Sequence, residues 1–146
     1  MLSSCAYTFT IFLAIAVYAV QFSIIQHRKH EKMMLRVISS TVDEESQIED
    51  LIPELPASMY VMILDDEGNV VEHSNDKKIV GLNLKSNVYM EKSIKKLVSK
   101  AVTGGGYTKF MWGDGQDITK HLAYSKRLDN KHTLCIIKDD FTKRYK

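Results

Sequence analysis

The chain has 146 residues, a formal net charge of +2 and two cysteines. A charge this small leaves no basic footprint of the kind that nucleic-acid-binding domains carry, so we expect no nucleic acid partner. Cys5 and Cys135 lie at opposite ends of the sequence, and no Cys/His cluster has the spacing of zinc ligands. We therefore expect neither a disulfide nor a metal site, and no cofactor.

The N-terminal 26 residues contain no charged side chain. The apolar run at 6–25 is long enough, at about 1.5 Å per residue, to cross a hydrocarbon core of about 30 Å. A secretory signal would carry basic residues before a shorter apolar core, and neither Lys nor Arg precedes this run. We expect residues 1–30 to be an uncleaved transmembrane anchor in membrane lipid, with a cleaved signal sequence as the alternative.

Apolar residues recur at every fourth position from Met34 to Val42. This spacing predicts that the N-terminal helix continues into a long helix over residues 31–52, which Pro53 ends. The juxtamembrane helix and linker, residues 31–56, would hold the next domain away from the bilayer. It could also associate with itself in a second copy or with other protein subunits.

Residues 57–146 alternate between strand-like and helix-like patterns. Strands are expected at 59–64, 69–73, 107–112, 118–126 and 133–138, and a helix with one apolar face at 88–102. Short turns separate the last three of these strands. The pattern predicts an α+β domain built on a five-stranded antiparallel sheet.

Three consecutive glycines, Gly104, Gly105 and Gly106, stand between the expected helix and an aromatic strand. A phosphate-binding loop needs the order strand, loop, helix and a Lys-Ser or Lys-Thr pair after its glycine. Here the order is reversed and the pair is absent. We expect instead that Gly104 or Gly105 takes a positive φ and ends the helix.

Four segments, in this order and spacing, resemble the Cache family of sensor domains, in particular the single, PAS-like type. They are YVMILDDEGNVVEHS (60–74), VGLNL (80–84), GGGYTKFMW (104–112) and HLAYSKR (121–127). The resemblance covers most of residues 57–141 and implies a PAS-like fold. In that fold the triple glycine and Gly81 would be structural positions.

The resemblance also implies a pocket for a small metabolite such as a carboxylate or an amino acid. Its candidate ligand-binding residues are Tyr107, Trp112, His121, Tyr124 and His73. For His73, which ends an expected strand, a surface role is the alternative. His121 stands where the family commonly has Lys, and Met111 where a basic residue is common, so much of the positive charge that an anionic ligand needs is removed.

Strand alternation limits how many aromatic side chains can line one pocket. It places Tyr107 on one face of the strand and Phe110 and Trp112 on the other, so some of these rings belong to the core. Trp112 is expected in the middle of the sheet, where it would matter more for folding than for binding.

No nucleophile, base and orienting group can be assembled from the histidines, so we do not expect an enzyme. After the last expected strand no second span, coiled coil or kinase follows. Two functions remain open. The first is an interaction or scaffold subunit of a membrane assembly with a degenerate pocket. The second is an extracytoplasmic carboxylate or amino-acid sensor that signals, for example in chemotaxis, through partner chains.

Two features of the sequence give opposite predictions for the side of the membrane on which the domain lies. Four basic residues between Arg28 and Arg36 follow the apolar run, and the positive-inside rule would place the domain in the cytoplasm. The Cache resemblance favours the other side. We expect a single-pass protein of the inner or cell membrane with a periplasmic or extracytoplasmic domain.

Overall fold

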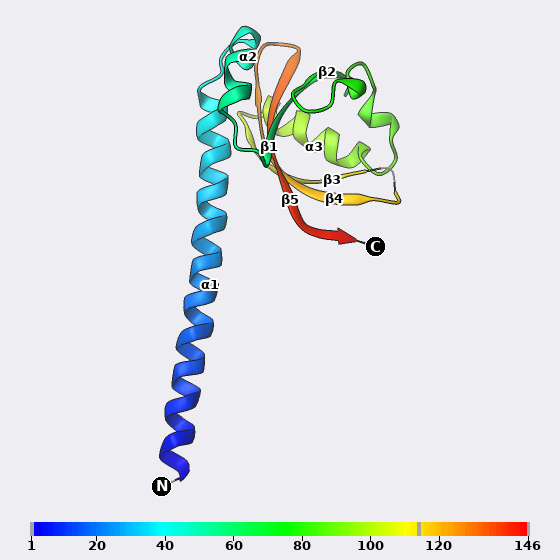
Figure 1. Cartoon of the computed structure of the whole chain (residues 1–146). Helices are drawn as coiled ribbons and strands as arrows, with labels where there is room; N and C mark the ends of the chain where they lie inside the picture. The colour runs from blue at the N-terminus through cyan, green and yellow to red at the C-terminus, as the bar shows by residue number, and fades with distance from the viewer. Residues whose placement is uncertain (1, 114, 146) are drawn as a thin grey trace. The chain divides into compact units, whose positions relative to one another are not determined.

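The computed structural model describes residues 2–113 and 115–145, with side chains for 11–113 and 115–139. It divides into two compact units, Met1–Met34 and Leu35–Lys146. Helix α1 (Leu2–Ser40) forms the described part of the first unit, and its last six residues, 35–40, belong to the second unit (Figure 1). Its Ile11–Ser40 part is long and apolar enough to cross a membrane, as the sequence predicts.

Helix α1 ends at Ser40, so the predicted helix over 31–52 is wrong beyond that residue. The hydroxyls of Ser39, Ser40 and Thr41 each donate to the carbonyl three residues earlier, at 2.6–2.7 Å. Such bonds satisfy the last carbonyls of the helix and compete with its continuation. Three short turns follow: η1 (Glu45–Gln47), α2 (Ile48–Leu51) and η2 (Ile52–Glu54).

Five strands form one sheet in the order β2-β1-β5-β4-β3, and every neighbouring pair is antiparallel. The strands are β1 (Met59–Asp65), β2 (Val70–His73), β3 (Gly106–Trp112), β4 (Ile118–Arg127) and β5 (His132–Tyr145). The predicted α+β fold with a five-stranded antiparallel sheet is confirmed. Strand β5 is longer than the predicted 133–138 because it keeps pairing with the start of β4.

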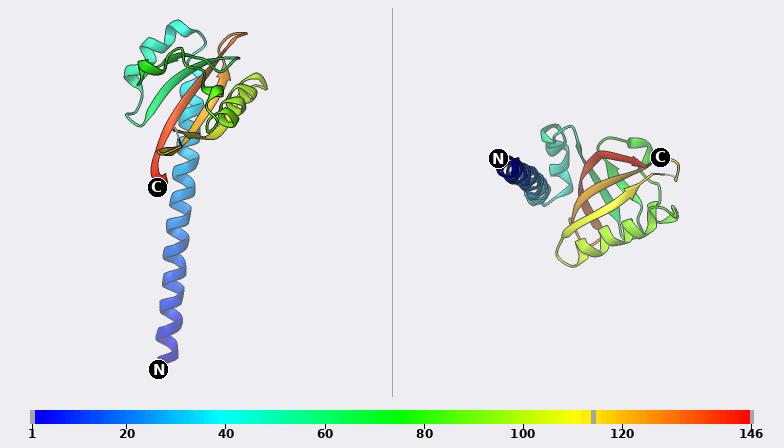
Figure 2. Two further views of the ribbon diagram at one scale, coloured as in Figure 1. Left: turned by 90° about the vertical axis from the view of Figure 1, so that its right-hand side faces the viewer. Right: turned by 90° about the horizontal axis from the view of Figure 1, so that it is seen from below.

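Helix α3 (Glu91–Val102) covers one face of the sheet (Figure 2). Its buried Ile94 and Leu97 pack in one cluster with Met62, Phe110 and Ile137 from the strands. Alternate strand residues are buried on the opposite face: Val61, Ile63, Leu134 and Ile136. Residues 35–56, which include buried Leu35, Val42 and Ile48, lie on that side, where Asp43 Oδ1 is 3.5 Å from Lys126 Nζ.

Glycines with a positive φ lie in the connections before and after α3. Gly104 and Gly105 have φ values of 104° and 95°, which confirms the predicted helix stop. The Gly105 N–H donates to Lys100 O at 2.9 Å and closes the last turn of α3. Between β2 and α3, after η3 (Lys77–Ile79) and before η4 (Leu84–Ser86), Gly81 has a φ of 88°. Its N–H donates to Val70 O.

Candidate ligand-binding site

A cavity of about 290 Å³ lies on the α3 face of the sheet, where β2 and β3 end and β1 and β4 begin. Its walls include Tyr60, His73, Trp112, Thr119, His121 and Asp139. The register explains why these side chains share a face. The cross-strand partners are Met62 with His73, Phe110 with His121, Trp112 with Thr119, and His121 with Asp139.

Four rings form the wall of the cavity. The ring centroid of Tyr60 lies 4.9 Å from that of His73 and 5.9 Å from that of His121. The centroid of Trp112 lies 6.1 Å from that of His73 and 6.3 Å from that of His121. These distances are within the range of aromatic contacts, so the four side chains hold one another in place.

His121 is fixed through both ring nitrogens. Its Nδ1 lies 3.1 Å from Tyr60 Oη, and its Nε2 lies 2.7 Å from Thr119 Oγ1 and 3.6 Å from Asp139 Oδ1. Burial, and then the nearby Asp139 carboxylate, raise the pKa of the Tyr60 phenol. The phenol therefore stays protonated, and it remains a neutral hydrogen-bonding group on His121.

His73 presents a different arrangement. Its Nδ1 accepts hydrogen bonds from the backbone N–H groups of Asn75 and Asp76, at 3.2 and 2.9 Å. The proton of the neutral ring must then sit on Nε2. Burial lowers the pKa of this imidazole, which favours the neutral form. Among the described residues, no hydrogen-bond partner meets the buried Nε2 donor.

The charge in the cavity walls is acidic. Asp76 and Asp139 line the cavity, whereas no Lys or Arg does among the residues that the structure describes. The neighbouring Lys77 pairs with Glu72 instead. The cavity therefore offers carboxylates, ring faces and one unused N–H donor. Such a set can hold a small polar molecule.

The sequence matches the family described as Single Cache domain 2 over residues 20–132. The chain belongs to this family. Its fold is similar to that in the crystal structure of a methyl-accepting chemotaxis protein from Vibrio parahaemolyticus RIMD 2210633. That match has a TM-score of 0.54 and 20% identity, and it covers 80% of this chain and 91% of that chain. No curated protein sequence matches this chain.

The Cache sensor domain is a class that is typically non-catalytic. Of the five ligand-binding candidates that the sequence suggests, the fold brings His73, Trp112 and His121 together around the cavity. Tyr107 and Tyr124 lie outside its walls. They pair on the other side of the sheet, with ring centroids 5.0 Å apart. A role of any of these residues in ligand binding stays a prediction.

The expected place of Trp112 is wrong. It is the last residue of the edge strand β3 and is half-buried, rather than central in the sheet. The expectation rested on its apolar neighbours. Apolar neighbours along a strand do not show where the strand ends or which strand lies at the edge of the sheet.

Tyr60 and Asp139 were missed as wall residues of the Cache domain cavity. Tyr60 carries the only hydroxyl in the otherwise apolar stretch MYVMIL, and this polar group in a buried strand is a usable signal. Asp139 follows the predicted end of the last strand at 138, and only the pairing with β4 places it opposite His121.

Proposed function

We propose that this chain is a membrane-anchored, extracytoplasmic sensor that binds a small polar ligand in the cavity beside His73. The observation that carries the proposal is the Nε2–H of His73, for which the described residues offer no hydrogen-bond partner. His73 is 5% exposed and lines the cavity with three other rings. A buried donor without a partner costs free energy, and a ligand acceptor would remove that cost. Family membership supports the sensor role.

The walls favour a ligand that carries an amino group. Asp76 and Asp139 attract a cation, and the ring faces of Tyr60 and Trp112 can stabilise one. A simple carboxylate would meet these two acids without a compensating Lys or Arg. We therefore propose an amino acid or a small amine that also has an acceptor for His73.

The segment before β1 offers a route for the signal. The Asp139 N–H donates to Ser58 O at 2.9 Å, and both residues line the cavity. In the chain, Ser58 follows residues 35–56, and this segment begins with the last turns of α1. A ligand that contacts Asp139 would change the balance between conformations of this segment and act on partner chains through the anchor helix.

The family and fold comparisons favour the sensor over the scaffold subunit that the sequence also suggests. The sensor makes a direct prediction. Full-length protein in detergent is screened by thermal shift against amino acids, amines and carboxylates. A ligand at about 100 times its dissociation constant should stabilise the fold by about 2.7 kcal/mol.

Two variants locate the binding site. In His73→Asn the side-chain oxygen can still accept from the N–H groups of residues 75 and 76, but the Nε2 donor is gone, so the shift should fall. Tyr107→Phe removes a hydroxyl on the other face and should leave the shift unchanged. A screen with no shift from any of the three ligand classes would contradict the sensor proposal.

A further inference from the structure

A second hollow lies between α3 and the edge strand β3 and has a volume of about 620 Å³. It shares no wall residue with the ligand cavity. Among its described wall residues five are lysines and none is acidic. We define the lysine groove by the four residues Lys92, Lys96, Lys100 and Thr108.

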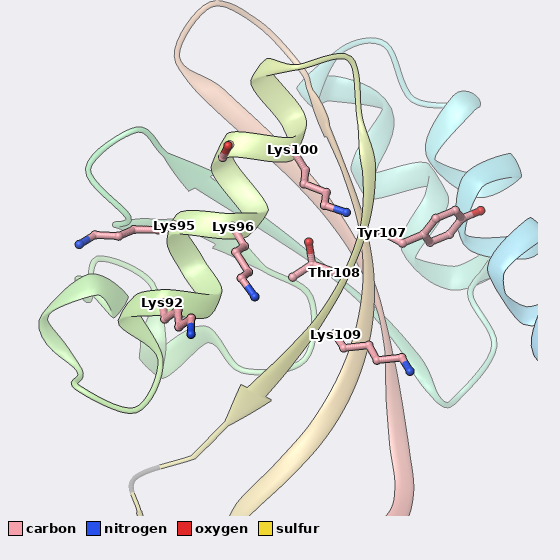
Figure 3. A pocket seen from close by; sticks show the side chains of 8 residues that line it. Lys92, Lys95, Lys96, Lys100, Tyr107, Thr108 and Lys109 are labelled. Carbon is pink, nitrogen blue, oxygen red and sulfur yellow. The ribbon is translucent and has the colours of Figure 1, made fainter.

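The three α3 lysines of the groove form a row. They are four residues apart, so successive ones are about 6 Å apart along the helix axis. Figure 3 shows Lys96 and Lys100 reaching toward β3, whereas Lys95 points away from it. Lys95 is bonded to Glu91. In the described part of the chain, no carboxylate pairs with Lys92, Lys96 or Lys100, so their like charges repel one another without compensation.

Thr108 supplies an independent observation in the same groove. It is 5% exposed, and its Oγ1 has no hydrogen-bond partner among the described residues. In Figure 3 its hydroxyl points from β3 into the space beside Lys96 and Lys100. Valine would fill the same volume in this strand without leaving a buried hydroxyl unsatisfied. The Thr108 hydroxyl and the side chains of Lys96 and Lys100 therefore point into the same space between α3 and β3.

We propose that the lysine groove binds an oxyanion of the phosphate class that carries at least two negative charges. The ammonium groups of Lys96 and Lys100 donate to its oxygens, Lys92 extends the positive row, and the Thr108 hydroxyl donates the innermost hydrogen bond. A soluble phosphate ester and an anionic lipid headgroup share this chemistry. The site is independent of the ligand cavity and of the sensor proposal.

The test uses the full chain in nanodiscs of phosphatidylcholine. Inorganic pyrophosphate is titrated at constant ionic strength, and hydrogen exchange of α3 and β3 peptides is followed by mass spectrometry. Saturable protection of these peptides is expected. A second arm omits pyrophosphate and adds phosphatidic acid to the nanodiscs, so that protection in this arm alone identifies a headgroup as the source.

Variants separate a built site from general charge screening. Lys96→Gln with Lys100→Gln should weaken pyrophosphate binding at least tenfold, whereas Lys95→Gln should change it less than twofold. Thr108→Val should weaken binding several-fold and leave the melting temperature of the free protein equal or higher. Absence of protection in both arms, or equal loss with Lys95→Gln, would overturn the proposal.

Discussion

At the scale of single residues, the buried imidazole of His73 makes stability depend on pH. Burial lowers its pKa below the ordinary value of 6.5. The unfolded chain therefore takes up a proton at a higher pH than the folded chain does. The stabilisation from the neutral ring is complete above the unfolded pKa and is lost as the pH falls through the folded one.

We expect the melting temperature of the wild type to fall more between pH 7.5 and pH 5 than that of His73→Asn. The asparagine oxygen can replace Nδ1 as the acceptor for the N–H groups of Asn75 and Asp76, and it does not titrate. Melting curves over this pH range measure the difference. Parallel curves for the two proteins would show that His73 is not held neutral by the fold.

Phe110 and Trp112 lie on one strand and should respond differently to truncation. Phe110 is 1% exposed, and Phe→Ala in a core costs about 3–5 kcal/mol of unfolding free energy. Trp112 is half-buried at the strand end and lines the cavity, so Trp112→Ala should cost less and reduce the ligand response. Urea unfolding of the two variants checks the order, and a larger loss for Trp112→Ala would contradict it.

The pattern of apolar and polar side chains predicts which segments form strands and helices, but it does not predict which residues contact one another in the fold. His73, Trp112 and His121 became candidates one by one through the family resemblance, which assigns roles to single positions of the sequence. Their meeting with Tyr60 depends on strand order and cross-strand register, and the hydrogen bond between Tyr60 and His121 joins residues 61 positions apart. Local periodicity contains no information on that pairing.

At the scale of elements, the end of α3 depends on its glycines to different degrees. Gly104 has a positive φ and open space around it, whereas an added Cβ at Gly105 would meet Tyr124 Oη at 2.9 Å and Ser125 O at 3.2 Å. Gly106 has no positive φ and would meet only the flexible Lys100 stem.

Alanine at each glycine should therefore destabilise the domain in the order Gly105, Gly104, Gly106. Positive φ alone costs an L-residue about 1–2 kcal/mol, and Gly105→Ala adds the steric clash. Denaturation midpoints of the three variants give the order. If Gly104→Ala and Gly106→Ala were equally destabilising, the positive φ of Gly104 would not be what ends the helix.

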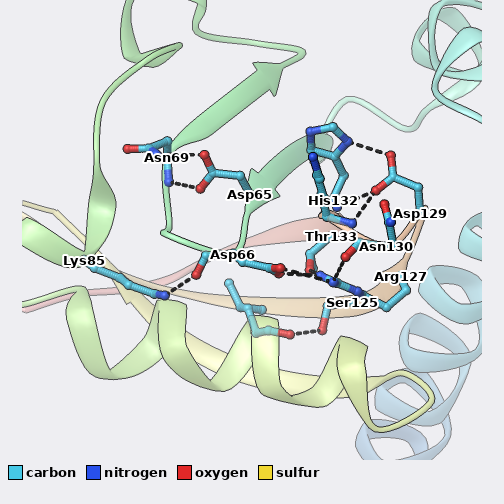
Figure 4. Close-up of polar contacts among 12 residues, drawn as sticks. Asp65, Asp66, Asn69, Lys85, Ser125, Arg127, Asp129, Asn130, His132 and Thr133 are labelled. Atoms are coloured by element: carbon cyan, nitrogen blue, oxygen red, sulfur yellow. Dashed lines mark hydrogen bonds and ion pairs between the residues drawn. The ribbon is translucent and has the colours of Figure 1, made fainter.

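The polar turns show another limit of the sequence. The acidic residues 65–67 lie at the turn between β1 and β2, and Arg127 donates to both carboxylate oxygens of Asp66, at 2.6 and 3.3 Å (Figure 4). This hydrogen bonding lowers the pKa of the Asp66 carboxyl. The contact ties the β1–β2 turn to β4. The turn itself was predictable from its residues, whereas its partner came from the order of strands in the sheet.

At the scale of the whole molecule, the two faces of the sheet carry different features. The face under α3 carries the cavity and the lysine groove, and the opposite face is covered by residues 35–56, which include the end of α1. Strand β1 contributes to both faces, because Tyr60 lines the cavity and Val61 is buried on the other side. Under the sensor proposal, a ligand that moves β1 would act on residues 35–56.

Sidedness is the property of the whole chain that most needs a direct test. The basic cluster after the apolar run favours a cytoplasmic domain, but Arg36 belongs to the second compact unit rather than to the span alone. A residue in a folded domain is weaker evidence for orientation than one in a short loop. We therefore expect the domain outside the cytoplasm, in agreement with the sensor proposal.

Lys131, exposed in the β4–β5 turn, is the position for the test. The Lys131→Cys protein should react with a membrane-impermeant thiol reagent on intact spheroplasts. The test is made in a Cys5→Ser background, and the Cys5→Ser chain is the control, because Cys135 is fully buried and burial raises its pKa to about 12, so its thiol should stay unreactive. Labelling of Lys131→Cys only after the membrane is broken would place the domain in the cytoplasm. That result would reject the extracytoplasmic sensor while leaving the fold and both candidate binding sites untouched.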